Sequence, residues 1–199
     1  MEALLELETW RWLVVLGPSA AILLVAAISD ALEQTIPNWL TYPSIGVGLA
    51  AQTAALGWHG LGWGLAAAVV TFLVGLVLFL PGWLGGGDVK LLTGVAAFLG
   101  FGALGEVLFY AIWTGFILGI ALSIINGYFI EMWQQIGRFF RGIFRAIWYR
   151  TGEPDEEMEP DERAAVPFGV AVFIGFVLAY SEAKFGWPGF LDWFLGSFR

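Results

Sequence analysis

The run Gly85-Gly86-Gly87-Asp88-Val89-Lys90 decides how this sequence folds, because it places a carboxylate beside three glycines between two strongly apolar segments. An ionisable side chain at the centre of a membrane span costs about 2.5 to 3.5 kcal/mol on insertion scales, so its presence indicates a functional site. A second acid, Asp30, ends the first apolar segment of the chain. Two lone carboxylates at membrane positions suggest a catalytic pair.

The composition around this run is that of a membrane protein. Apolar residues make up 59% of the 199 residues and charged residues only 13%, which leaves too little polar surface to cover a water-soluble globule. The apolar runs are continuous, unlike the alternating strands of a membrane barrel. We therefore predict an all-α fold, a polytopic integral membrane protein built as a bundle of about six transmembrane helices plus an interfacial amphipathic helix.

The predicted spans follow from the length of about 20 apolar residues that a helix needs to cross the hydrocarbon core. They cover residues 12–28, 37–56, 61–80, 89–101, 104–125 and 166–180. An outer loop containing His59 is expected at 57–60. No internal repeat is visible, so a single transmembrane domain is expected over residues 1–199.

A polar insert at about 128–163 separates the last two spans. Arg138, Arg141 and Arg145 recur at helical spacing opposite apolar residues, which predicts a helix lying in the membrane interface over 128–150. The following segment, 153–163, is acidic and interrupted by prolines, which is typical of a linker.

The cations predict how the chain is oriented. Arginine and lysine near span ends are retained on the cytoplasmic side, and five of the nine lie in the insert. With the insert in the cytoplasm, the turn after the first span and the glycine run both reach the cytoplasmic face. Asp30 and Asp88 are therefore expected at the same membrane face.

Three short sequence motifs follow one another along the chain. Asp30 is followed by Ile36-Pro37-Asn38, the glycine run reads Gly85-x-Gly87-Asp88-x-Lys90, and the last span opens with Val166-Pro167-Phe168-Gly169-Val170-Ala171. Together they resemble the type IV prepilin peptidase family over nearly the whole chain. The short, single-domain form is similar to the branch that processes Flp-type pilins.

The resemblance implies a GxGD-type intramembrane aspartic protease, with Asp30 and Asp88 as its catalytic pair. It would hydrolyse the leader peptide bond of type IV pilin precursors at the cytoplasmic face of the inner (plasma) membrane. The partners implied are a prepilin with a basic leader and a hydrophobic helix, and membrane lipids, with no nucleic acid. No metal or cofactor is expected.

The reaction that the two aspartates would catalyse is the hydrolysis of an amide bond. Two carboxylates brought close together cannot both ionise, so one holds a proton while the other acts as a base. The ionised partner takes a proton from a water held between them, and the protonated partner donates toward the scissile carbonyl oxygen. Which of the two starts protonated is left open.

Supporting roles are expected for the glycines and the lysine of the central run. Without a Cβ, Gly85 and Gly87 can take positive φ and let a substrate backbone approach closely. The run would also place Asp88 at the amino end of the fourth helix, where unpaired amides favour a carboxylate. Lys90 points to a different helix face, where it would anchor to interfacial phosphates or bias the site electrostatically.

The other two motifs are expected to support the site through the backbone. Pro37 and Asn38 start the second helix and fix the turn that holds Asp30, since proline is tolerated in a first helical turn. Pro167 and Gly169 would shape a kink or a close packing contact near the site.

Two alternatives remain open. An archaeal preflagellin peptidase shares the two-acid design, and residue types do not separate it from a bacterial pilin enzyme. From another class, an ion- or proton-coupled transporter would use Asp88 to bind an ion at a broken helix, although such transporters usually show matching breaks in two repeated halves. The substrate and the oligomeric state are not determined by the sequence.

Overall fold

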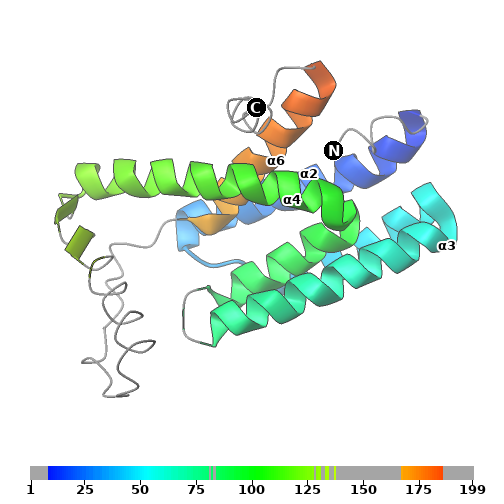
Figure 1. Ribbon diagram of the computed structural model, residues 1–199, viewed down its shortest axis with the longest axis horizontal. Coiled ribbons are helices and arrows are strands. Elements are labelled where there is room, and N and C mark those ends of the chain that lie inside the picture. Colours follow the sequence, from blue (N-terminus) through cyan, green and yellow to red (C-terminus); the bar gives the residue numbers. More distant parts are fainter. Residues whose placement is uncertain are drawn as a thin grey trace, which may run out of the picture. The chain divides into compact units, whose positions relative to one another are not determined.

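The computed structural model describes residues 9–80, 82, 84–127, 129–130, 133–134, 137 and 167–185. All regular secondary structure in these residues is α-helical, which confirms the predicted all-helical class (Figure 1). The three arginines of the predicted interfacial helix and the whole acidic segment 153–163 lie outside the described residues.

Four helices in the described part of the chain are long and apolar enough to cross a membrane. They are α2 (Thr9–Glu33), α3 (Asn38–Phe79), α4 (Gly86–Ile125) and α6 (Phe168–Phe185). The predicted spans 37–56 and 61–80 both fall on α3, and the predicted spans 89–101 and 104–125 both fall on α4. The first and last predicted spans fall on α2 and α6.

The long helices α3 and α4 each contain one non-helical residue. Gly57 has φ 65° and ψ −148°, and Gly100 has φ 67° and ψ −176°. Positive φ is accessible to glycine at little cost because it has no Cβ. The loop predicted at 57–60 was wrong, since one glycine makes the bend and helical structure resumes directly after it.

A short turn joins α2 to α3 and is closed by local hydrogen bonds. The N–H of Gln34, which has φ 52°, donates to the carbonyl of Asp30 at 2.9 Å. The hydroxyl of Ser29 donates to the carbonyl of Thr35 at 2.9 Å. Pro37 then caps α3 in an extended conformation, and its carbonyl accepts two amides of the first turn. These bonds fix the last turn of α2 relative to the start of α3.

The described residues belong to two compact units, one formed by residues 1–114 with 167–199 and the other by 115–166. In the first unit α2 packs against both α3 and α6. Large, fully buried apolar side chains come from α2, α4 and α6, among them Leu23, Leu91, Phe98 and Val172. These four residues belong to one hydrophobic core cluster.

Glycines let the helices of the first unit approach closely. A Cβ at Gly48 of α3 would lie 2.9 Å from the backbone nitrogen of Phe98, and a Cβ at Gly175 of α6 would lie 2.6 Å from that of Ala111. Small residues at such contacts are typical of helix packing in membranes, where close backbone approach replaces the hydrophobic effect.

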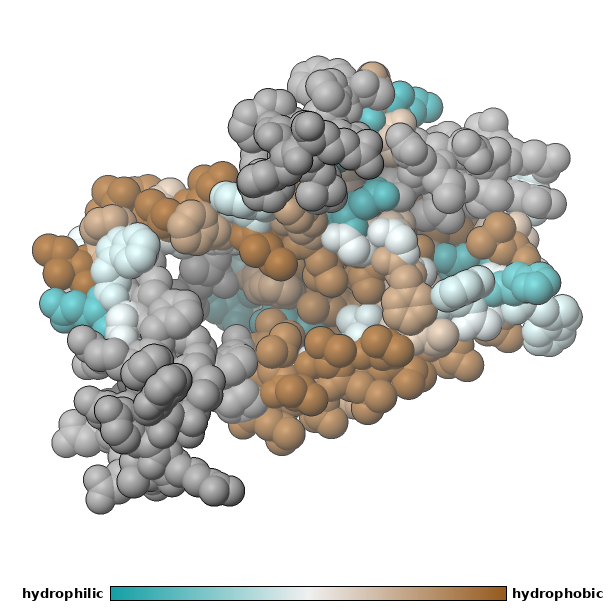
Figure 2. Space-filling model, viewed as in Figure 1, coloured by the Kyte–Doolittle hydropathy of each residue, from teal (hydrophilic) through white to brown (hydrophobic). Residues whose placement is uncertain are grey.

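Outward-facing side chains of the same unit are apolar. Figure 2 shows hydrophobic side chains gathered over α3, and Val70, Leu73 and Val77 of this helix are 46%, 54% and 66% exposed. Large contiguous apolar surfaces of this kind mark contact with a membrane or another protein. With four apolar helices of spanning length, the chain is a membrane protein.

Candidate active site

Asp30 lies in the last turn of α2 and is 6% exposed. Its Oδ2 atom accepts a hydrogen bond of 2.6 Å from the N–H of Gly169, in the first turn of α6. A Cβ at Gly169 would lie 3.2 Å from that same Oδ2 atom. The glycine therefore allows the start of α6 to sit directly against the carboxylate of Asp30.

Asp88 lies in the first turn of α4 and is half-buried. Its Oδ2 atom accepts the N–H of Gly85 at 3.2 Å, while the carbonyl of Gly85 accepts the N–H of Val89 at 3.1 Å. An acid at the third helical position that reaches back to the amide before the helix is one half of a capping box. The hydrogen bond from Gly85 therefore keeps the Asp88 side chain at the amino end of α4.

The glycines before Asp88 do not behave as predicted. Gly85, Gly86 and Gly87 all have negative φ, and the last two are already helical; positive φ occurs earlier in this turn, at Gly82 (79°). Their small size serves packing instead, since a Cβ at Gly87 would lie 3.3 Å from the Cβ of Ile36. The α2–α3 turn therefore packs onto the residue next to Asp88.

The structure brings Asp30 and Asp88 together. Their carboxylates are close enough to interact electrostatically, although they come from different helices and are far apart in the sequence. The contact between Ile36 and Gly87 explains the proximity, because it joins the turn after Asp30 to the turn that carries Asp88. A pair of neighbouring acids of this kind can share a proton and act as general acid and general base.

Lys90 has two partners that the sequence analysis did not identify. Its ammonium group donates to Oδ1 of Asn38 at 2.7 Å and lies 4.9 Å from the centroid of the Tyr42 ring. A helix that begins at Asn38 places Tyr42 one turn later on the same face, so the helical spacing was a usable signal. The lysine ties the first turn of α3 to the first turn of α4, beside Asp88.

The remaining predicted residues lie at helix starts. Pro37 is the cap residue of α3. Pro167 directly precedes α6, and its carbonyl accepts the N–H of Ala171 at 3.3 Å, which starts the helix whose first turn contains Gly169. The predicted site residues thus lie at four helix ends, the end of α2 and the starts of α3, α4 and α6.

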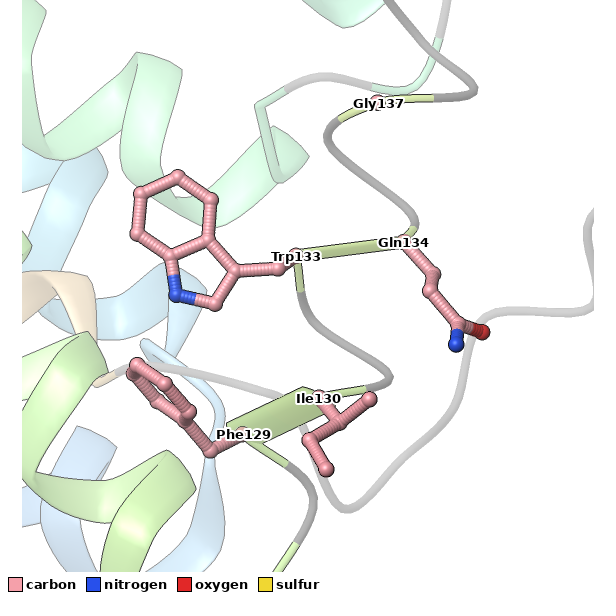
Figure 3. A pocket seen from close by; sticks show the side chains of 5 residues that line it. All are labelled: Phe129, Ile130, Trp133, Gln134 and Gly137. Atoms are coloured by element: carbon pink, nitrogen blue, oxygen red, sulfur yellow. The ribbon is translucent and has the colours of Figure 1, made fainter.

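A hollow in the second unit offers no comparable chemistry. It has a volume of about 360 Å³ and is lined by Phe129, Ile130, Trp133, Gln134 and Gly137 (Figure 3). The rings of Phe129 and Trp133 meet edge to face with centroids 6.2 Å apart. None of these five residues is ionisable.

Comparison with known proteins gives a family match. A model of the type IV leader peptidase family matches residues 19–120, which is slightly more than half of the chain. The matched range contains both aspartates, Lys90 and the start of α3, and it ends before Pro167. No curated protein and no solved structure matches the chain.

Proposed function

Because the chain belongs to the type IV leader peptidase family, we propose that it is an aspartic endopeptidase that removes the leader peptide from prepilin-type precursors, with Asp30 and Asp88 as the catalytic pair. Membership in this family implies a protease that processes prepilin-type substrates. The observation that carries the aspartic assignment is that two carboxylates, one buried in the last turn of α2 and the other in the first turn of α4, lie within electrostatic range of each other.

The proposed reaction uses the two acids in different protonation states. The ionised carboxylate takes a proton from a water held between Asp30 and Asp88, and the resulting hydroxide adds to the scissile carbonyl carbon. The protonated carboxylate donates its proton to the carbonyl oxygen, which gives a neutral gem-diol. Collapse of the diol breaks the C–N bond: the carboxyl that took the proton of the water gives it to the departing nitrogen, which leaves as an amine. The other carboxylate takes the proton of one diol hydroxyl as the new carboxyl C=O forms, which restores the starting protonation states.

Backbone amides orient the two acids for this work. The N–H of Gly169 holds Oδ2 of Asp30, and the N–H of Gly85 holds Oδ2 of Asp88. Each bond occupies the Oδ2 atom of its carboxylate, so in the proposed mechanism the two Oδ1 atoms are the ones that act on the water. Such fixed donors need no reorganisation during the reaction, which is the general advantage of a preorganised site.

Six membrane crossings are part of the proposal. The 42 residues of α3 would extend about 63 Å as a straight helix, twice the hydrocarbon thickness of about 30 Å. We infer that α3 turns back at Gly57 and that α4, with 40 residues, turns back at Gly100. Trp58 after the Gly57 bend and Trp39 at the start of α3 are 82% and 69% exposed, as expected for tryptophans at the two interfaces.

With this path, Asp30 and Asp88 reach one face, which the arginines of the insert assign to the cytoplasm. The site then faces the cytoplasmic side of the plasma membrane, within a single domain that spans residues 1–199. An Flp-type prepilin would place its hydrophobic helix against the bundle and present its leader peptide bond to the two acids.

Processing of a precursor in cells tests the proposal. The chain is co-expressed with an Flp-type prepilin, and the precursor is followed by its gel mobility and by the amino-terminal sequence of the product. Asp30→Asn and Asp88→Asn remove each acid with little change of shape. Glu33→Gln, an exposed position one turn after Asp30, is the matched control.

The wild type and Glu33→Gln should convert the precursor, while both aspartate variants should leave it uncut. Conversion by either aspartate variant would remove that residue from the mechanism. A chain that cuts an archaeal preflagellin but no pilin precursor would identify the preflagellin alternative. Proton flux into vesicles that depends on Asp88, without cleavage of any precursor, would favour the transporter.

A further inference from the structure

Gln52 is a buried polar residue in the apolar interior of the bundle. It lies on α3, five residues before the bend at Gly57, and is 2% exposed. Its side-chain Nε2 donates a hydrogen bond of 2.6 Å to the backbone carbonyl of Phe98 on α4. The bond therefore joins two helices from within the membrane-embedded core.

The acceptor of this bond lies at the bend in α4. In a regular helix the carbonyl of Phe98 would accept the N–H of residue 102, and the non-helical Gly100 stands between them. A Cβ at Gly100 would lie 3.9 Å from Nε2 of Gln52, so the amide sits beside the bend. In lipid no water can satisfy a backbone carbonyl, and beside this bend the Gln52 amide donates to the carbonyl of Phe98.

Three helical segments meet at this residue. Gly60, after the bend in α3, lies against the carbonyl of Gln52 so closely that a Cβ would overlap it. A Cβ at Gly64 would lie 3.4 Å from Cγ of Gln52 and 2.9 Å from the carbonyl oxygen of Ala97. Both halves of α3 and the first segment of α4 therefore converge on Gln52.

The other polar atom of the Gln52 side chain, Oε1, indicates that the position is used for its donor and not for its acceptor. Oε1 of Gln52 is buried and has no hydrogen-bond partner, the one such side-chain atom in the part of the chain that the structure describes. A buried unpaired acceptor is unfavourable, and an apolar residue would avoid it. The position therefore gains from the Nε2 donor, which an apolar residue would lack.

The segment 86–99 connects this junction to Asp88. It is a continuous helical rod, and about 15 Å of helix separates residue 98 from residue 88. Some of its close contacts with α3 are made by small or apolar groups, such as Gly75 against Val89, and such contacts carry no directed bond. The bond from Lys90 to Asn38 holds the start of the rod, and the bond from Gln52 to Phe98 holds its other end, so that together these two directed hydrogen bonds restrain its height and rotation.

We propose that Gln52 is a positioning residue that sets the height and rotation of the helical rod 86–99, and thereby places Asp88 opposite Asp30. The inference rests on the proposed function for its consequence in catalysis. Its structural part, the placement of the rod, stands independently of the reaction. Gln52 touches neither aspartate, so its loss should lower the rate of the chemical step and leave substrate binding nearly unchanged.

Kinetics of purified variants give the first measurement. Gln52→Met keeps the length of the side chain and removes the donor. Thr53→Val is the matched control, because the Thr53 hydroxyl donates only within α3, to the carbonyl of Leu49 at 2.6 Å. A misplacement of about 1 Å can cost up to about a hundredfold in rate, so we expect kcat of Gln52→Met to fall at least tenfold with KM within about twofold, and Thr53→Val to match the wild type.

Cysteine cross-linking gives a second measurement that does not depend on activity. The chain has no cysteine of its own, and a Cβ at Gly75 would lie 3.4 Å from the Cβ of Val89, close to the separation of a disulfide. The pair Gly75→Cys with Val89→Cys should oxidise readily in membranes. The yield should drop when Gln52→Met is added and stay constant when Thr53→Val is added.

The two measurements separate the possible failures. Unchanged kcat and unchanged cross-linking in Gln52→Met would overturn the inference, and so would reduced cross-linking with unchanged kcat. Reduced cross-linking in a protein whose wild type cuts no precursor would support the placement of the rod and reject the proposed function. If Gln52→Met does not accumulate in membranes, Gln52→Asn, which keeps a shorter amide, must show the same two losses in milder form.

Discussion

At the scale of single residues, the site depends on one interaction that occurs twice. Asp30 and Asp88 each accept a backbone N–H from a glycine near the start of a helix: Gly169 donates to Asp30, and Gly85 donates to Asp88. Hydrogen bonds from backbone amides to carboxylates are directional, so they restrain the orientation of each acid, and the bond to Asp30 is the shorter of the two. The two glycines are close to the carboxylates because neither carries a Cβ.

Gly169 should therefore not tolerate even one methyl group. A Cβ there would lie 3.2 Å from both the carbonyl oxygen of Ala26 and Oδ2 of Asp30, so Gly169→Ala must push α6 away from α2. We expect kcat to fall by about tenfold or more because the Asp30 carboxylate is displaced. Gly17→Ala on α2, where nothing lies within 4 Å, is the control and should keep wild-type kcat. Wild-type kcat in Gly169→Ala would contradict the close approach.

The bond between Lys90 and Asn38 should be measurable as a coupling energy. The free energy of unfolding in detergent is compared for Lys90→Met, Asn38→Ala and the double variant. Because Asn38 is exposed and Lys90 half-buried, we expect a coupling of about 1 kcal/mol, below the full value for a charged hydrogen bond. Additive effects of the two changes would show that the bond contributes nothing to stability.

At the scale of helices, packing depends on which glycine faces a neighbour. Gly46 and Gly48 lie two residues apart on α3, yet a Cβ at Gly46 meets nothing within 4 Å while a Cβ at Gly48 would lie 2.9 Å from the Phe98 backbone. We expect Gly48→Ala to lower the free energy of unfolding by about 2 kcal/mol through overpacking, and Gly46→Ala to have little effect. Thermal unfolding in one detergent measures both, and equal midpoints would contradict the α3–α4 contact.

The positions of the helices were largely predictable from the sequence, because lipid forces apolar chain segments into helices. The predicted second span ended at Leu56, and α3 bends at Gly57; the predicted fourth span ended one residue after the bend at Gly100. What hydropathy could not show is that these breaks are bends at single glycines, since it does not report the backbone angles at one residue.

Contacts between the helices were less predictable. A helix that is apolar on all sides gives no amphipathic pattern, so periodicity does not tell which face of α3 meets α4. The partner of Gln52 therefore became visible only in the structure, whereas for Lys90 the spacing of Asn38 and Tyr42 was a partial signal. The aspartates could be paired from the sequence because a membrane has only two faces, and the cations predicted one face for both.

At the scale of the whole molecule, six crossings make a prediction about access from each side. Single cysteines are introduced into the cysteine-free chain at Glu33 and Gly82, in the turns near the aspartates, and at Gly62, just after the bend at Gly57. A membrane-impermeant thiol reagent should label the first two only from the cytoplasmic side. It should label Gly62→Cys only from the outside, because α3 crosses the membrane between its start and its bend.

Labelling of Gly62→Cys and Glu33→Cys from one side would rule out the bend at Gly57 as a return point. It would also leave α3 as a single tilted or partly inserted helix. The sides of Glu33→Cys and Gly82→Cys test a separate point, because labelling from opposite sides would place Asp30 and Asp88 at different membrane faces.

The central claim is that two acids, brought together from different helices, hydrolyse one peptide bond. The most direct measurement is the turnover of a synthetic prepilin by the purified protein in lipid discs, with the released leader quantified by mass spectrometry for the wild type, Asp30→Asn, Asp88→Asn and Glu33→Gln. Loss of a general acid or base should lower kcat by at least about a hundredfold in both aspartate variants, while Glu33→Gln keeps wild-type turnover. Turnover within a few-fold of the wild type in either aspartate variant would contradict the account.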